Sequence, residues 1–301
     1  MSLEYIFDDI TIACTNVDRV MFPETGVTKA ELIAYYHQIA DHMLPELRDR
    51  PVSVERYTKG IDRGGFFQKH FQKHFPDWLG RAELGSKTKV VYPIVDSTAG
   101  LVYLANQGSI AFHVWTSRKD TPEYPDLLVF DLDPPEGRFD LVRETALHLR
   151  DLFEELELPA FVKTTGGKGL HVIAPTDGRA TYGEVMQLCN KISALLCKRH
   201  PDKVTSEFYK KDRKGRLYLD VMRNALGATI IAEYSVRGRP GAPISAPITW
   251  AEVSDPKMAP NGFKLRDMRK RLDKRGDPWS ALRAKLGSVD TADAALDDIE
   301  E

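Results

Sequence analysis

The sequence predicts an α+β protein in which helices and strands are interspersed, and not a regular doubly wound sheet. Three observations predict this class. Capping boxes at Thr28 and Thr181 open two helical patterns, and a third pattern begins near Asp140. Apolar runs between these helices are typical of strands, and several of them follow one another directly. A chain of 301 residues is long enough to bury a sizeable core.

The individual elements follow from these patterns. Glu31 reaches back to the cap at Thr28, and Pro45 is expected to interrupt the last turn of that helix. Further helices are predicted over residues 140–156 and from Thr181 to about Lys198. The predicted strands cover residues 110–115, 127–130, 171–174, 217–222 and 229–236. All of these elements are assigned to one domain, residues 1–286, with a sublobe boundary near residue 100.

Charge is distributed unevenly along the chain. Residues 287–301 contain six acids and no base, which predicts an acidic, flexible tail and leaves a net charge of +4 on residues 1–286. Residues 264–285 contain nine bases and three acids, a pattern that suits either a nucleic-acid surface or a solvated helix face. No apolar run is long enough for a membrane span, and the three cysteines form no CxxC pair. We therefore expect a cytoplasmic protein, and one that is nucleoid-associated if residues 264–285 form a nucleic-acid surface.

Three aspartates stand in apolar, strand-like surroundings. Asp131 and Asp133 are two residues apart at the end of a strand, so their carboxylates lie on one face. Asp220 lies between Leu219 and Val221, where a carboxylate needs a partner or a metal ion. Oxygen ligands suit Mg²⁺ or Mn²⁺, and two such ions support in-line phosphoryl transfer. The alternative is that Asp131 and Asp133 only cap a strand and bind loop amides.

Two further segments suit the binding of phosphate groups. Residues 163–171 join a glycine-rich turn to Thr165, Lys168 and His171, although the Walker pattern is absent. Such a stretch is equally typical of a plain hairpin turn, and His171 alone is typical of a core histidine. Arg237 and Arg239 share one side of an extended segment and either grip a triphosphate or line a solvated edge.

Aromatic and basic residues near the N-terminus suit DNA. Phe66 and Phe67 stand beside glycines and Lys69, and they either stack on bases or belong to the core. Arg19 and Lys29 flank the turn before the first helix, and Lys29 is its first residue, where the helix dipole also favours an anion. His70 and His74 have the spacing of a zinc helix, but no Glu or Cys completes that site.

Four motifs in order resemble the polymerase domain of bacterial ligase D, which belongs to the archaeo-eukaryotic primase superfamily. They are FDLD at 130–133, TTGGKGLH at 164–171, LYLD at 217–220 and VRGRPGAP at 236–243. The resemblance covers residues 10 to about 285 and implies a two-lobed primase-like fold with mixed or antiparallel sheets flanked by helices. Arg19 replaces a lysine, and Thr165 a serine, that many relatives carry.

The resemblance also implies roles for single residues. The metal ligands would be Asp131, Asp133 and Asp220. The triphosphate site would comprise Thr165, Lys168, His171, Arg237 and Arg239, with His113 near the sugar 2′-hydroxyl. The DNA contacts would be Arg19 and Lys29 at the 5′-phosphate of a downstream strand, Phe66 and Phe67 on the template, and Lys69 on phosphate.

The implied function is nucleotidyl transfer to DNA ends in non-homologous end joining. The resemblance implies gap filling and both templated and non-templated addition. It also implies two Mn²⁺ or Mg²⁺ ions as cofactors and nucleoside triphosphates as substrates, with ribonucleotides favoured. The implied partners are gapped or recessed DNA ends with a 5′-phosphate, a Ku-type protein, and ligase and phosphoesterase domains. No KxDG ligase motif and no histidine-rich phosphoesterase region are present, so nick sealing is not expected.

Three alternatives remain at this point. A primase would use the same carboxylates to start strands from two nucleotides, although no Cys/His cluster suggests the zinc element that such primases often carry. A metal-dependent phosphodiesterase or nuclease belongs to a different reaction class. A non-catalytic DNA-end module would bind without turnover.

Overall fold

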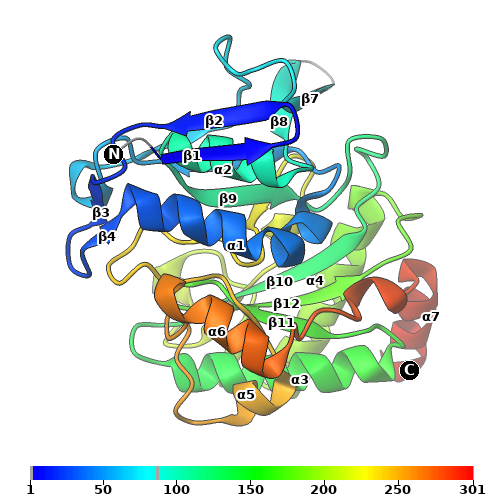
Figure 1. Cartoon of the computed structure of the whole chain (residues 1–301). Helices are drawn as coiled ribbons and strands as arrows, with labels where there is room; N and C mark the ends of the chain where they lie inside the picture. Colours follow the sequence, from blue (N-terminus) through cyan, green and yellow to red (C-terminus); the bar gives the residue numbers. More distant parts are fainter. Residues whose placement is uncertain (1–2, 86–87, 301) are drawn as a thin grey trace. The chain divides into compact units, whose positions relative to one another are not determined.

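The computed structural model describes residues 3–85 and 88–300 and has the α+β architecture that the sequence predicts (Figure 1). The chain forms two compact units. Unit 1 comprises residues 1–115, 229–246 and 263–276, and unit 2 comprises residues 116–228, 247–262 and 277–301. The sequence suggests a sublobe boundary near residue 100. That residue lies inside helix α2, and the chain first passes from unit 1 to unit 2 after Trp115.

Unit 2 is built on a six-stranded sheet in the order β13-β14-β10-β12-β11-β16. All neighbours are antiparallel except β13 and β14. The central strand β10 is buried over residues 127–130, which explains its unbroken apolar run, and Phe130 packs edge-to-face on Phe153 of α3. The strands are β10 (Leu127–Asp133), β11 (Phe161–Thr164), β12 (Leu170–Pro175), β13 (Val204–Thr205), β14 (Leu217–Asp220) and β16 (Pro247–Ile248).

The helices of unit 2 begin close to where the sequence places them. Helix α4 (Tyr182–Arg199) starts with the complete capping box of Thr181 and Glu184, and α3 (Phe139–Glu155) packs against β10 and β12. A short helix, α5 (Trp250–Ser254), packs against α3.

The C-terminal segment differs from the flexible tail that was expected over residues 287–301. Residues 289–300 form helix α7 (Val289–Glu300), which packs against α4 with Ala292 and Leu296 fully buried. Lys191 of α4 holds Asp293 at 2.8 Å and Asp297 at 3.0 Å. The small apolar residues between the acids form a helical stripe, and this burial outweighs the repulsion among the acids.

Unit 1 contains a four-stranded antiparallel sheet in the order β15-β9-β5-β6, with α1, α2 and α6 and three hairpins. The sheet strands are β5 (Val52–Arg56), β6 (Phe66–Gln68), β9 (Ser109–Trp115) and β15 (Thr229–Ile231). The hairpins are β1 (Leu3–Phe7) with β2 (Ile10–Cys14), β3 (Val20–Phe22) with β4 (Val27–Thr28), and β7 (Gly80–Leu84) with β8 (Val90–Ile94). The helices are α1 (Lys29–Leu47), α2 (Thr98–Asn106) and α6 (Leu265–Arg275).

Two details of unit 1 correct the sequence analysis. Helix α1 has the predicted capping box but continues past Pro45 to Leu47, because a proline so near the end removes only one hydrogen bond while Met43 and Leu47 remain buried. The strand expected over residues 229–236 ends at Ile231. Tyr234 adopts a positive φ of 61°, which turns the chain out of the extended conformation.

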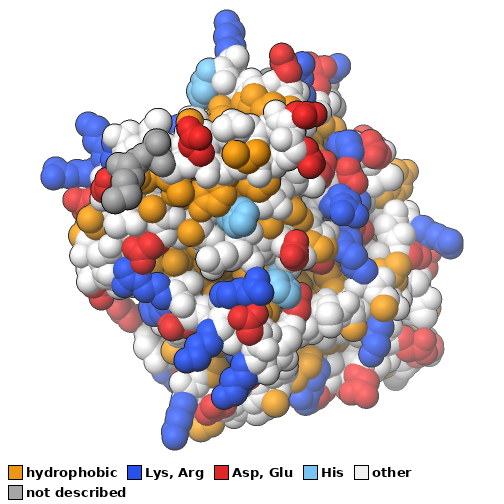
Figure 2. Space-filling view, viewed as in Figure 1, with side chains coloured by type: hydrophobic (Ala, Val, Ile, Leu, Met, Phe, Trp, Pro, Cys, Tyr) orange, Lys and Arg blue, Asp and Glu red, His pale blue; other side chains and the backbone are white. Residues whose placement is uncertain are grey.

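The basic run at 264–285 includes α6, whose apolar residues Leu265, Met268 and Leu272 are buried. Two of its arginines pair with acids of unit 1, Arg266 with Glu31 at 2.8 Å and Arg269 with Asp273 at 2.9 Å. Figure 2 shows positive and negative side chains interspersed over the visible face. This arrangement is typical of a solvated helix face. Among the residues that the structure describes, no helix is both long and apolar enough to span a membrane.

Candidate active site

The register of unit 2 brings the three predicted aspartates to one end of its sheet. Asp131 of β10 lies directly opposite Asp220 of β14, and Asp133 lies opposite Tyr218. Residues 131 and 133 are separated by one buried leucine, so their side chains emerge on the same face. Residues 89 positions apart in sequence are therefore neighbours across a strand pair.

Two arginines neutralise part of this negative charge. The Nε atom of Arg223 lies 3.3 Å from Oδ2 of Asp131 and 3.9 Å from Oδ2 of Asp220. The Nη1 atom of Arg213 lies 3.1 Å from Oδ2 of Asp133. The sequence analysis identified neither arginine, although Arg223 follows Asp220 by three residues and lies in the turn that ends β14.

The pKa shifts show how the charges are balanced. Burial acts to raise the pKa of Asp131, but His171 and Arg223 outweigh it and the pKa is lowered. The pKa of Asp220 is raised, first by burial and then by the charges of Asp131 and Asp133, against the lowering effects of Arg223 and a backbone hydrogen bond from Met222. Burial and the neighbouring acids thus disfavour the charged form of Asp220, and a further cation would stabilise that form.

His171 belongs to this carboxylate cluster. Its Nε2 atom lies 3.5 Å from Oδ1 of Asp131, and its side chain is 4% exposed. Burial lowers its pKa despite the opposing effect of Asp131, with Lys163 adding to the lowering. Among the described residues its buried Nδ1 atom has no hydrogen-bond partner. A buried, unsatisfied nitrogen is costly, which makes His171 more than a satisfied core histidine.

The glycine-rich stretch forms the turn of the β11–β12 hairpin. The Oγ1 atom of Thr165 accepts hydrogen bonds from the N–H groups of Gly167 and Gly169, at 3.3 and 3.4 Å, and the hydroxyl therefore shapes the turn. At Gly169 a Cβ atom would lie 2.1 Å from the carbonyl oxygen of Leu132, so only glycine allows the turn to approach β10 this closely. Lys168 is exposed at the tip.

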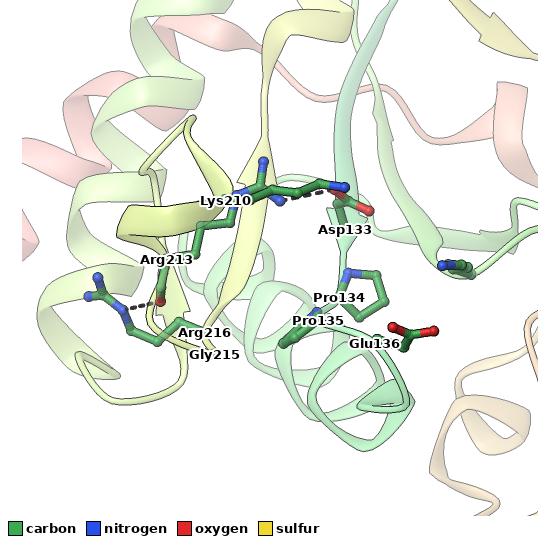
Figure 3. Close-up of a pocket in the computed structure, with 9 residues that line it drawn as sticks. Asp133, Pro134, Pro135, Glu136, Lys210, Arg213, Gly215 and Arg216 are labelled. Atoms are coloured by element: carbon green, nitrogen blue, oxygen red, sulfur yellow. Dashed lines mark hydrogen bonds and ion pairs between the residues drawn. The ribbon is translucent and has the colours of Figure 1, made fainter.

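A cavity of about 300 Å³ lies beside Asp133 within unit 2 (Figure 3). Its lining includes four cations, Lys168, Lys210, Arg213 and Arg216, and two acids, Asp133 and Glu136. Arg213 also donates to the carbonyl groups of Glu207 and Phe208, which fixes the loop before β14 next to Asp133. A mostly cationic cavity beside a carboxylate suits an anion such as a phosphate chain.

Unit 1 carries the other predicted nucleotide-binding residues. His113 of β9 is bonded through Nε2 to Oε1 of Glu55 at 2.9 Å. Arg237 is partly buried and Arg239 is exposed in the segment after the chain leaves β15. Burial and Glu55 raise the pKa of Tyr57, and the charges of Arg237 and Arg239 lower it. The two arginines are therefore close enough to Tyr57 to affect it electrostatically, as is Glu55 of the Glu55–His113 pair.

The predicted template residues lie on β6 of unit 1. Phe66 and Phe67 are 52% and 53% exposed, which excludes the core position considered for them. Arg56 lies over the ring of Phe66 at 5.7 Å, and Phe67 meets His113 edge-on at 5.4 Å. Lys69 is exposed directly after the strand. Large exposed aromatics beside cations are suited to stacking against bases.

Arg19 and Lys29 lie together at the start of α1. The side chain of Lys29 is buried and donates from Nζ to the carbonyl oxygen of Thr15 at 2.6 Å. Burial, reinforced by Arg19, lowers the pKa of Lys29 to about 8. The first N–H groups of α1 already have acceptors: the carbonyl oxygens of Arg19 and Val17 and the hydroxyl of Thr28. An anion at this place would therefore meet side chains and not helix amides.

The three carboxylates are chemically suited to divalent cations, but in this structure their oxygens are not spaced as metal ligands. Three carboxylates as oxygen ligands suit Mg²⁺ or Mn²⁺, and a cation would stabilise the charged form of Asp220. Within residues 3–85 and 88–300, no group of three or more His, Cys, Asp or Glu side chains already has the spacing of a metal site. The guanidinium groups of Arg213 and Arg223 contact carboxylate oxygens that such ions would bind.

The sequence matches the family model described as LigD, primase-polymerase domain, over residues 28–279. It is 34% identical over 289 residues to the multifunctional non-homologous end joining protein LigD of Mycobacterium bovis. It is 32% identical over 267 residues to the bifunctional non-homologous end joining protein LigD of Bacillus subtilis. These alignments cover 93% and 88% of the chain but only 38% and 43% of the relatives.

A solved structure is also similar. The polymerase domain of Mycobacterium tuberculosis ligase D, in complex with DNA, matches with a TM-score of 0.86 and 33% identity. The match covers 92% of this chain and 99% of that one. Sequence and fold agree over nearly the same span. The chain therefore belongs to the LigD primase-polymerase domain family.

Proposed function

We propose that this chain is a metal-dependent nucleotidyltransferase that extends DNA ends during non-homologous end joining, with ribonucleotides favoured. The observation that carries the proposal is the pairing of Asp131 with Asp220 across two strands, with Asp133 on the same face. The names of the relatives, which include non-homologous end joining and a DNA-bound polymerase domain, support the same activity.

Asp131, Asp133 and Asp220 would hold two Mn²⁺ or Mg²⁺ ions. Bound there, the ions would make the attacking 3′-hydroxyl more acidic and neutralise the leaving pyrophosphate. The arginines now paired with these acids, Arg213 and Arg223, would give up carboxylate oxygens to the ions. His171 keeps Asp131 in its charged form, because its contact lowers the pKa of that carboxyl.

Each unit, taken by itself, offers groups that suit the phosphates of a nucleoside triphosphate. In unit 2, Lys168 offers an exposed charge at the hairpin tip, and Thr165 shapes the turn by accepting hydrogen bonds from the N–H groups of Gly167 and Gly169. In unit 1, Arg237 and Arg239 carry guanidinium groups that suit bidentate contacts with phosphate. His113 would recognise the 2′-hydroxyl of the sugar.

DNA contacts are proposed for unit 1. Phe66 and Phe67 would stack on the template strand, with Lys69 on a nearby phosphate. Arg19 and Lys29 would bind the 5′-phosphate of the downstream strand in a gap. A Ku-type end-binding protein and ligase or phosphoesterase domains are proposed partners, and they are consistent with relatives more than twice as long as the matched region.

The test of this function is incorporation on a gapped, 5′-phosphorylated duplex with Mn²⁺ and labelled nucleoside triphosphates. Elongation of the primer supports the proposal. Synthesis without a primer supports a primase, shortening of the DNA supports a phosphodiesterase, and binding without turnover supports a non-catalytic module.

Lys29→Met is expected to weaken binding to a 5′-phosphorylated gap roughly tenfold and binding to a hydroxyl-ended gap less than twofold. Methionine keeps the buried apolar stem but removes the charge that would meet the phosphate. Fluorescence anisotropy with both gaps measures the difference. The control is Lys89→Met, because Lys89 is exposed and paired with Glu83. Equal weakening on the two gaps would remove the phosphate pocket from this place.

The preference for a 5′-phosphate is also expected to decline as the pH rises through about 8. Lys29 has a lowered pKa of about 8, so below this pH it is charged before the phosphate arrives. Above it, binding must take up a proton, and affinity falls with each further pH unit. A titration from pH 6.5 to 9.5 with both gaps measures this, and a constant preference would contradict the assignment.

A further inference from the structure

Glu55 links His113 to a tyrosine on one face of the unit 1 sheet. Ser53 of β5 lies opposite His113 of β9, and Glu55 lies two residues further along β5, on the same face and diagonal to the histidine. On the other side of β5, Glu55 lies opposite Phe67 of β6. Three strands thus bring a histidine, an acid and an exposed aromatic onto one surface.

Both carboxylate oxygens of Glu55 are engaged. Oε1 lies 2.9 Å from Nε2 of His113, and Oε2 accepts a hydrogen bond from the hydroxyl of Tyr57 at 3.2 Å. The side chains of His113 and Glu55 are only 12% and 24% exposed. A charge-assisted contact in such partial burial orients both partners more firmly than the same contact in water.

The ring of Tyr57 packs closely against the backbone of two glycines, Gly65 and Gly238. A Cβ atom built on Gly65 would lie 2.5 Å from the tyrosine ring, and one built on Gly238 would lie 2.4 Å from it. The ring therefore packs against two glycines, and Gly238 is the residue between Arg237 and Arg239. The chain of contacts runs from the arginine segment through Tyr57 and Glu55 to His113.

Glu55 is ionised at neutral pH. Its pKa is lowered to about 2, chiefly by the hydrogen bond with His113, with Arg237 adding to the effect against the cost of burial. An ionised carboxylate accepts hydrogen bonds and donates none. The Nε2 atom of His113 must therefore carry a proton in either charge state of the ring, and in the neutral ring this fixes the tautomer.

We propose that Glu55, held in place by Tyr57, is a positioning residue that sets the sugar selectivity of the enzyme by fixing the ring orientation and tautomer of His113. The inference rests on the proposed role of His113 at the sugar 2′-hydroxyl. With one tautomer, the ring presents the same hydrogen-bonding group to every substrate. A site built to bond a hydroxyl then discriminates against a sugar that lacks it.

The experiment compares four variants with the unaltered chain: Glu55→Gln, Tyr57→Phe, His113→Ala and the double variant Glu55→Gln/His113→Ala. Glutamine keeps the shape of Glu55 without its charge, and phenylalanine keeps the ring against the two glycines. Glu83→Gln and Tyr103→Phe are matched controls elsewhere in unit 1. The readouts are kcat/KM for a ribonucleoside and the matching deoxyribonucleoside triphosphate, and the ring nitrogens of His113 by ¹⁵N NMR without substrate.

We expect Glu55→Gln to lower the ribonucleotide preference roughly fivefold to tenfold, and Tyr57→Phe roughly twofold to threefold. The double variant is expected to lose no more preference than His113→Ala alone, because the two residues act through one contact. The NMR spectrum should show the Nε2-protonated ring in the unaltered chain and a mixture of tautomers in Glu55→Gln. The two controls should leave both readouts unchanged.

The two possible failures are distinguishable. If Glu55→Gln lowers kcat/KM equally for both sugars while His113→Ala erodes the preference, Glu55 is merely structural and the inference is overturned. If His113→Ala leaves the preference unchanged, the sugar role of His113 fails, and the NMR spectra then report only whether Glu55 fixes the ring. An unchanged tautomer in Glu55→Gln would overturn the positioning claim directly.

Discussion

Asp131→Asn is expected to lower nucleotide incorporation on the order of a thousandfold or more while changing DNA affinity less than twofold. Asparagine preserves the size of the side chain but removes the charge that a divalent cation requires. The neighbouring charges amplify the loss, because Asp131 is the carboxylate that both His171 and Arg223 contact. Single-nucleotide incorporation and anisotropy on the same gapped duplex measure the two quantities.

The matched control for this variant is Asp151→Asn. Asp151 is an exposed acid on α3 that pairs with Arg150, its neighbour in the chain, so its loss should change neither incorporation nor binding. Normal turnover by Asp131→Asn would remove the metal-site assignment. A parallel loss of DNA binding would instead indicate that the substitution disturbs the fold of unit 2.

Asn224→Ala is expected to destabilise the protein by about 3 to 5 kcal/mol. The Asn224 side chain is fully buried and bonds both the N–H and the C=O of Val129, at 2.8 and 2.7 Å, and also the carbonyl of Val221 at 2.9 Å. Alanine would leave buried backbone groups of β10 without partners, two residues before Asp131. Urea-induced unfolding measures the free energy.

The control for this variant is Asn190→Ala on the exposed face of α4. That change removes a weaker helix former from an exposed position and should alter stability by less than 1 kcal/mol. An Asn224→Ala protein as stable as the control would show that the turn after β14 does not anchor the central strand.

The fold elements that sequence predicts best are those with local signals. The capping boxes at Thr28 and Thr181 are present because a threonine and a glutamate three residues later satisfy each other's backbone groups. The alternation of side chains on a strand placed Asp131 and Asp133 on one face. The pairing of Asp131 with Asp220 is a long-range register that the spacing of residues does not determine, and it was anticipated only through the resemblance to a family.

The features that escaped prediction depend on tertiary contacts. Residues 289–300 form a helix because Lys191 of α4 pairs with its acids and its apolar stripe is buried against α4, whereas the acidic residues alone suggest disorder. The sequence does not reveal that β15 and α6 belong to unit 1, because both segments return to it from late in the chain. The alternation of Val52 and Val54 with Ser53 and Glu55 is typical of a strand. Nothing in the local sequence indicates that His113 is the partner of Glu55.

The central claim is that Asp131, Asp133 and Asp220 hold divalent cations beside a nucleoside triphosphate. The most direct test is anomalous scattering from a crystal soaked with Mn²⁺ and a non-hydrolysable nucleotide. We expect manganese peaks within about 2.3 Å of oxygens from all three carboxylates, with Arg213 and Arg223 displaced. Manganese bound elsewhere, with both arginines still on the carboxylates, would contradict the account.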